Sequence, residues 1–208
     1  MGRPRKPIYG IAINDAPYNT EWSEVVNKGD GEAKRVNYIC PYFKVYKSMV
    51  TRAYSSSLHR RHPSYKECSV DPRWHNFMAF REWMESQDWK GKQLDKDLLY
   101  PGNKVYGPET CCFIEKRVNI FIQHMHNDDP SSFYGVCYEK KSPRPKCQFG
   151  GRHVGYFDTQ QEAHEKWREL KHAQANELAD KQTDQRIAKA LRARYADHSI
   201  CCGSINRG

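Results

Sequence analysis

The sequence predicts an α+β protein made of two small modules. One indication is residues 93–119, where short extended segments, a glycine turn and a helix follow one another. Another is a polar run at residues 127–132, after which three short strand patterns alternate with turns and lead into a helix. We therefore expect a strand–strand–helix module with helical support over residues 38–126, a linker at 127–132, and a three-stranded antiparallel sheet packed on a helix over 133–180.

The ends of the chain are expected to be less regular. Residues 1–37 are predicted to be a basic tail followed by an irregular segment, and residues 181–208 a basic helix and a tail. The first residues, MGRPRKP, contain Arg3 and Arg5 around a proline and resemble the core of an AT-hook. An extended Arg-Pro-Arg segment can lie in the minor groove of DNA, but a short basic tail matches this pattern easily by chance, and a solvated tail is the favoured interpretation.

Two helices are expected to support the first module. After Pro41, large apolar side chains recur at intervals of three and four residues as far as Tyr54, which predicts an amphipathic helix. A second helix is predicted to begin at Asp71-Pro72, with the aspartate as N-cap and the proline in the first turn. Its aromatic residues recur at helical spacing, so we assign them to the core.

Residues 93–119 contain the candidate catalytic groups. We expect a strand ending in Leu94–Leu99, a turn at residues 101–104, further extended segments at 105–106 and 110–114, and a helix from Glu115. This order could bring Asp95 and Asn119 together as oxygen ligands for Mg²⁺ or Mn²⁺. An ordinary hairpin with solvated aspartates is the alternative interpretation.

The same residues resemble a known family. The ordered string LDKD, GNK, PETC and a later Asn is similar to the HNH, or ββα-metal, endonucleases, especially phage-encoded homing-type members. The resemblance implies metal ligation by Asp95 and Asn119, and a turn residue near DNA at Asn103. One departure concerns the general base, because Lys96 stands where the family usually has His. A lysine is protonated at neutral pH, so we expect Lys96 to hold the scissile phosphate as a cation. The attacking water is then deprotonated at the metal, or through Asp97 or a histidine from elsewhere.

The second module contains the expected DNA-reading surface. Three short strands precede a helix that begins at Thr159, and residues 133–179 resemble the Apetala/ethylene-response-factor type DNA-binding domain. In that family the sheet enters the major groove. Strand alternation also sends Arg144, Lys146 and Gln148 to one side. The expected DNA-contacting residues are Tyr138, Lys140, Arg144, Lys146, Gln148, Arg152 and His153.

Composition agrees with a nucleic-acid partner. The 208 residues have a formal net charge of +9 and a sequence pI near 9.1, so a polyanion is attracted. Arg60 and Arg61 form a basic loop expected to face phosphate. There is no apolar run long enough to span a bilayer, so we expect no membrane partner. We further expect a cytoplasmic protein, of a bacterial host if phage-encoded, and a monomer as the simplest state.

Cysteine spacing gives little support to a structural zinc site. None of the eight cysteines forms a C-x-x-C pair, and reduced thiols are usual in the cytoplasm. The sharpest zinc candidate is the set Cys40, His59, His62 and Cys68, but its spacing is loose. We therefore do not expect structural zinc.

The functional prediction is a sequence-directed DNA endonuclease of the HNH homing type, which hydrolyses phosphodiester bonds with a divalent metal. The main alternative is a nuclease-derived DNA-binding regulator that no longer cuts, a possibility that Lys96 keeps open. An RNA-binding accessory protein is a third option, which a comparison of duplex DNA with RNA in one binding assay would test.

Overall fold

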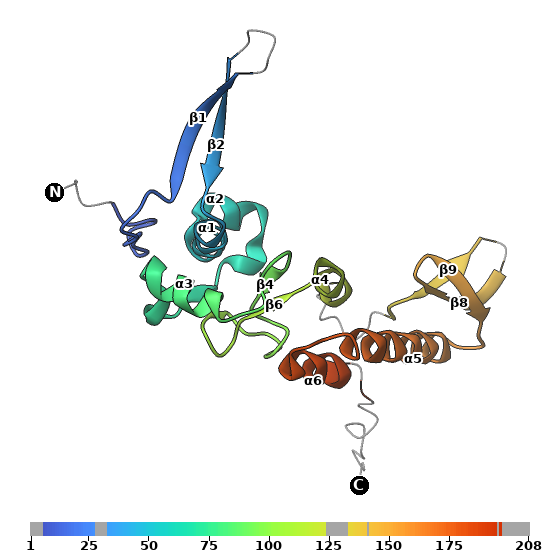
Figure 1. Cartoon of the computed structure of the whole chain (residues 1–208). Helices are drawn as coiled ribbons and strands as arrows, with labels where there is room; N and C mark the ends of the chain where they lie inside the picture. Colours follow the sequence, from blue (N-terminus) through green and yellow to red (C-terminus); the bar gives the residue numbers. More distant parts are fainter. Residues whose placement is uncertain (1–5, 28–32, 124–132, 141, 195, 197–208) are drawn as a thin grey trace. The chain divides into compact units, whose positions relative to one another are not determined.

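The computed structural model describes residues 6–27, 33–123, 133–140, 142–194 and 196 (Figure 1). The chain divides into two compact units, residues 1–119 (unit 1) and residues 120–208 (unit 2). Helices and small, mostly antiparallel sheets occur in both, which confirms the predicted α+β class. The linker expected at residues 127–132 lies outside the described residues.

Unit 1 begins with a hairpin that the sequence did not predict. Strands β1 (Glu21–Asn27) and β2 (Ala33–Ile39) pair antiparallel along their whole length, and Figure 1 shows them extending away from the helices. Every residue of β1 is exposed. The expectation of an irregular segment here was wrong, because cross-strand pairs such as Trp22 stacked on Tyr38 hold the hairpin without a buried face.

The helical core of unit 1 follows. Helix α1 (Pro41–Tyr54) confirms the predicted amphipathic helix, and α2 (Ser56–Arg61) and a 3₁₀ turn, η1 (Pro63–Tyr65), come next. The helix predicted from Asp71 is instead split into a 3₁₀ turn, η2 (Pro72–Trp74), and α3 (Phe77–Glu85). The Asp71 carboxylate accepts the Arg73 N–H at 2.9 Å and so caps η2, not α3. Tyr46, Met49, Trp74, Phe77 and Phe80 are fully buried in one aromatic core.

Short strands attach the candidate site to this core. Strand β3 (Ser69–Val70) pairs parallel with β5 (Val105–Tyr106), and β4 (Gln93–Asp95) pairs antiparallel with β6 (Cys112–Ile114). Helix α4 (Lys116–Gln123) begins directly after β6. The two strands of the predicted strand–turn–strand pattern are therefore β4 and β6, while β5 joins a different sheet.

Unit 2 contains the predicted sheet and helix. Strands β7 (Val136–Glu139), β8 (Ser142–Phe149) and β9 (Arg152–Tyr156) form an antiparallel sheet with β8 in the centre. Helix α5 (Gln160–Ala179) is capped by the Thr159 hydroxyl, which accepts the Glu162 N–H at 3.1 Å. It packs on β8 and on α6 (Gln185–Arg194).

The core between the sheet and α5 is small. Cys147, Ala163 and Trp167 are its buried members, with partly buried rings around them. Gly135 has a φ of +72°, and a Cβ there would stand 1.9 Å from Trp167 Cδ1, so only glycine fits. None of the helices in the described parts of the chain is long and apolar enough to cross a membrane.

Candidate functional site

Asp95 lies at the end of β4, where its carboxylate turns the chain. Its Oδ1 accepts the backbone N–H groups of Asp97 at 3.0 Å and Leu98 at 2.7 Å. Within the described residues, Oδ2 has no hydrogen-bond partner. Burial raises the pKa of the Asp95 carboxyl, while the Leu98 N–H acts in the opposite direction. Asp95 therefore holds the loop through one carboxylate oxygen, and its second oxygen has no part in those backbone hydrogen bonds.

Asn119 on α4 reaches the same strand. Its side-chain nitrogen donates to Gln93 Oε1 at 2.6 Å. Gln93 and Asp95 are two residues apart on β4, so their side chains point to the same face, about 7 Å apart along the strand. The pairing of β4 with β6 and the immediate start of α4 thus place Asp95 and Asn119 on one face of the hairpin.

Lys96 does not take the expected role. Its side chain is buried, with 5% exposure, and its ammonium donates to Asp97 Oδ1 at 2.6 Å and to the Asn103 carbonyl at 2.9 Å. The expectation that Lys96 holds the scissile phosphate was wrong, because the ammonium points into the protein and an internal carboxylate neutralises it. Asp97 is correspondingly committed to this ion pair.

Asn103 holds the loop that carries these residues. Its amide nitrogen donates to the carbonyls of Lys96 at 2.9 Å and Val105 at 2.7 Å, while its Oδ1 accepts the Val105 N–H at 3.2 Å. Gly102, with a φ of +78°, makes the preceding turn possible. Both N–H groups of the amide are used within the loop, so the observed task of Asn103 is structural. Its expected contact with DNA stays a prediction.

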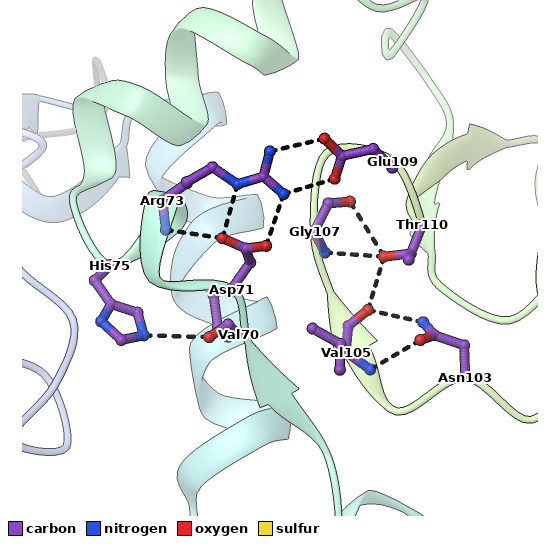
Figure 2. A network of polar contacts seen from close by, with 9 residues as sticks. All are labelled: Val70, Asp71, Arg73, His75, Asn103, Val105, Gly107, Glu109 and Thr110. Atoms are coloured by element: carbon purple, nitrogen blue, oxygen red, sulfur yellow. Dashed lines mark hydrogen bonds and ion pairs between the residues drawn. The ribbon is translucent and has the colours of Figure 1, made fainter.

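A polar network that sequence reasoning missed supports the same loop (Figure 2). Arg73 donates to both oxygens of Glu109, at 2.7 and 2.6 Å, and also to Asp71, which ties η2 to the loop after β5. Hydrogen bonds from Arg73 lower the pKa of both carboxyls. Thr110 completes the turn by accepting the Gly107 N–H at 3.1 Å and donating to the Val105 carbonyl at 2.8 Å. Charge pairs 36 residues apart leave no signal in one sequence.

The outer face of the unit 2 sheet presents polar side chains. Along β8, Pro145 and Cys147 are buried toward α5, whereas Arg144 and Gln148 are exposed on the other side. Lys146 donates to Glu139 at 2.5 Å, and Tyr156, opposite it on β9, donates to the same carboxylate at 2.7 Å. The predicted alternation of Arg144, Lys146 and Gln148 is confirmed.

Register arranges the other candidates of this sheet. His153 pairs with Gln148 and so belongs to the outer face, while Arg152 pairs with Phe149, whose ring packs against the helix-side core. Arg152 is therefore on the helix side of the sheet, although it is exposed. Tyr138 is exposed and accepts a hydrogen bond from Gln160 at 2.7 Å, and Lys140 is exposed after β7.

The remaining expected residues are scattered. Arg60 and Arg61 are exposed in the last turn of α2, whereas Arg3 and Arg5 lie outside the described residues. His59 contacts the Arg52 carbonyl at 2.9 Å, and the Cys68 thiol faces the Ser64 carbonyl at 3.9 Å. Over the ranges that the structure describes, no group of three or more His, Cys, Asp or Glu residues could hold a metal ion.

Comparison with known proteins adds no assignment. No family model matches the chain, and neither the search of curated proteins nor the search of solved structures found a match.

Proposed function

We propose that the chain is a metal-dependent DNA endonuclease whose C-terminal sheet binds the DNA. One observation supports the cleavage half most directly: β4, β6 and α4 follow one another so that Asp95 and Asn119 share a face. That order of elements is the one implied by the resemblance of residues 93–119 to HNH nucleases.

The residues present fit one hard divalent cation. Asp95 has an oxygen without a hydrogen-bond partner in the described residues, and Asn119 adds an amide on the same face. Two protein oxygen ligands suit Mg²⁺, which keeps several waters and accepts phosphate oxygens. When bound, such an ion would polarise the scissile phosphate and supply a water of lowered pKa. Asp95 and Asn119 would hold it.

The chain's own residues supply positioning. Lys96, Asp97 and Asn103 lock the loop after β4, so the Asp95 carboxylate keeps one orientation. Arg73 and Glu109 fix the next loop. A preorganised carboxylate needs no reorganisation when the substrate arrives, which is the property a phosphoryl-transfer site requires.

Cleavage is tested by nicking of supercoiled plasmid in Mg²⁺ or Mn²⁺. We expect Asp95→Asn and Asn119→Ala each to reduce nicking at least about 100-fold, as expected for losing a group that stabilises the transition state. The matched control is Asp88→Asn, because Asp88 is an exposed carboxylate of the same unit. Mn²⁺ binding followed by electron paramagnetic resonance gives a second readout, and Asp95→Asn should weaken it. Wild-type nicking rates in Asp95→Asn would refute the site.

DNA binding by the sheet is tested separately. Lys146→Gln removes one cation from the outer face of the sheet. If that cation contacts one phosphate, the slope of log affinity for duplex DNA against log salt should fall by about 0.9 in magnitude. Lys166→Gln is the control, because Lys166 is also ion-paired but lies on α5. An unchanged slope in Lys146→Gln would remove this lysine from the interface.

A DNA-binding regulator without cleavage is the second candidate. The buried ammonium of Lys96 favours it, because the position where the resembled family has its base contains no proton acceptor. If the wild-type chain binds duplex DNA but nicks none in Mg²⁺ or Mn²⁺, this function replaces the first.

A further inference from the structure

Unit 1 has an open groove that the proposed cleavage site does not use. It has a volume of about 520 Å³ and lies between α1 and the segment of α2 and η1. A groove of this size admits a nucleotide-sized group. It is lined by Ile39, Lys44, Lys47, Ser48, Thr51, Arg52, Leu58, His62 and Tyr65.

The charge of this groove has one sign. Lys44, Lys47 and Arg52 come from one face of α1, and none of the described residues that line the groove is acidic. Lys47 pairs with Glu21 at 2.7 Å, but both side chains are about half exposed, so the pair contributes little and can be exchanged for another anion. Lys44 is exposed. The groove therefore favours an anionic ligand.

Aromatic and hydroxyl groups accompany the cations. The rings of Tyr65 and His62 lie 6.4 Å apart, edge to face, on the wall opposite α1. Cations interleaved with rings suit a ligand that has both phosphates and flat groups.

A buried tyrosine ring connects the groove to the loop after Asp95. The Arg52 guanidinium lies 5.2 Å from the centre of the Tyr106 ring, and the Lys96 ammonium lies 5.7 Å from the same centre. Lys96 directly follows Asp95. One tyrosine ring thus contacts both the last cation of the groove and the loop that holds the candidate metal ligand.

We propose that this groove binds the phosphodiester backbone of duplex DNA beside the cleavage site. Lys44 and Arg52 are eight residues apart, about 12 Å along the helix. That length covers about three phosphates of one strand of B-DNA, whereas a single phosphate would meet only one of these cations. The proposal rests on the proposed function, and it adds a second DNA-binding surface in unit 1 to the sheet of unit 2.

The test measures duplex binding by the full chain in EDTA, where no cleavage occurs. Changing Lys44 and Lys47 together to Gln removes two phosphate contacts, so the slope of log affinity against log salt should fall by about 1.8 in magnitude. The ratio of the variant's affinity to the wild-type affinity should therefore change about tenfold between 50 and 200 mM salt. The control changes Lys90 and Lys92 together to Gln. In this pair Lys92 is ion-paired with Asp88, whereas Lys90 is exposed and has no carboxylate partner among the described residues. Its slope should match the wild-type slope apart from a small general charge effect.

Other outcomes separate this proposal from the proposed function. An unchanged slope in the Lys44/Lys47 variant overturns the groove, even if Mg²⁺-dependent nicking is intact. A reduced slope supports the groove, even if no nicking is found. Thymidine 5′-monophosphate distinguishes a free-nucleotide site: its binding by wild type, its loss in Lys44→Gln and an unchanged DNA slope together would overturn the DNA assignment.

Discussion

Each unit buries a lysine, and the two lysines are held in different ways. Lys96 in unit 1 donates to a carboxylate and a carbonyl. Lys171 in unit 2 is 8% exposed, and its ammonium lies over aromatic rings, 4.4 Å from the Phe121 centre, 5.6 Å from Trp167 and 6.0 Å from Phe149. Burial lowers the pKa of Lys171. The ion pair of Lys96 fixes a loop around its charge, whereas the described contacts of Lys171 include three rings, and its burial disfavours the charged form.

The difference matters for function because each lysine belongs to a structure that presents a candidate site. Lys96 braces the loop behind Asp95, and its loss would disturb this candidate metal ligand. Lys171 is on the helix that covers the unit 2 sheet, next to Trp167 of the small core. Replacing each lysine tests whether the ion pair of Lys96 and the ring contacts of Lys171 stabilise the unit that contains them.

Tryptophan positions allow both units to be followed in one experiment. The chain has five tryptophans, of which Trp167 alone is in unit 2. With 5-fluorotryptophan, fluorine NMR during urea unfolding reports each unit separately. The free energy of unfolding of each unit is then the measured quantity.

The largest effect is expected for Gly135→Ala. The new Cβ would stand 1.9 Å from Trp167 Cδ1, and the φ of +72° strains any other residue, so unit 2 should lose about 4 kcal/mol. Gly150→Ala is the matched control. It has a φ of +57° with open space around the added carbon, and should cost only about 1 kcal/mol. Equal losses in the two variants would show that Trp167 does not stand against Gly135.

Lys96→Met should have the next largest effect. It leaves Asp97 partly buried without its cation and the Asn103 carbonyl without its donor, so unit 1 should lose about 3 kcal/mol. Lys90→Met, at an exposed position, should change stability by less than about 0.5 kcal/mol. A histidine at position 96 should also destabilise the loop, not restore a general base. Normal stability together with faster nicking in Lys96→His would return this position to the catalytic site.

The sequence predicted the elements whose burial pattern is periodic. The apolar spacing of α1, the alternation along β8 and the Thr159 cap of α5 all follow from side-chain period and local hydrogen bonding. The hairpin of β1 and β2 was missed because its stability depends on pairing across strands and it has no buried face to leave a pattern.

The candidate site was predictable only in part. The order of the motif predicted a strand, a strand and a helix, and these are β4, β6 and α4. Strand alternation does not govern Lys96, because β4 ends at Asp95 and the Lys96 ammonium pairs with Asp97 in the loop that follows. Position in the family motif suggested a phosphate contact for Lys96. The bonds of Arg73 to Glu109 and of Lys96 to Asn103 join residues through the fold, so local pattern does not specify them.

The smallest effect is expected for Lys171→Met, and unlike the other changes it should raise the free energy of unfolding of unit 2. Removing the desolvated charge should by itself stabilise unit 2 by about 1 kcal/mol at pH 7. The lost interactions of the ammonium, including those with the rings, oppose this gain. A loss of more than about 2 kcal/mol would show that these interactions hold the charged lysine as firmly as the carboxylate holds Lys96.

The pH dependence of unit 2 sharpens the same comparison. Because the pKa of Lys171 is lowered in the folded state, the unfolded chain binds more protons between that lowered pKa and the ordinary lysine value of about 10.4. Stability attributable to Lys171 should therefore rise with pH across this window, by at most about 1.4 kcal/mol per pH unit. Burial raises the pKa of Cys147 in the same core, which acts in the opposite direction. That thiol is present in wild type and in Lys171→Met, so the difference between the two proteins isolates the lysine. Urea unfolding from pH 7 to pH 10 should show the wild-type deficit relative to Lys171→Met shrinking as pH rises, and a constant difference would mean that Lys171 keeps its ordinary pKa among the rings.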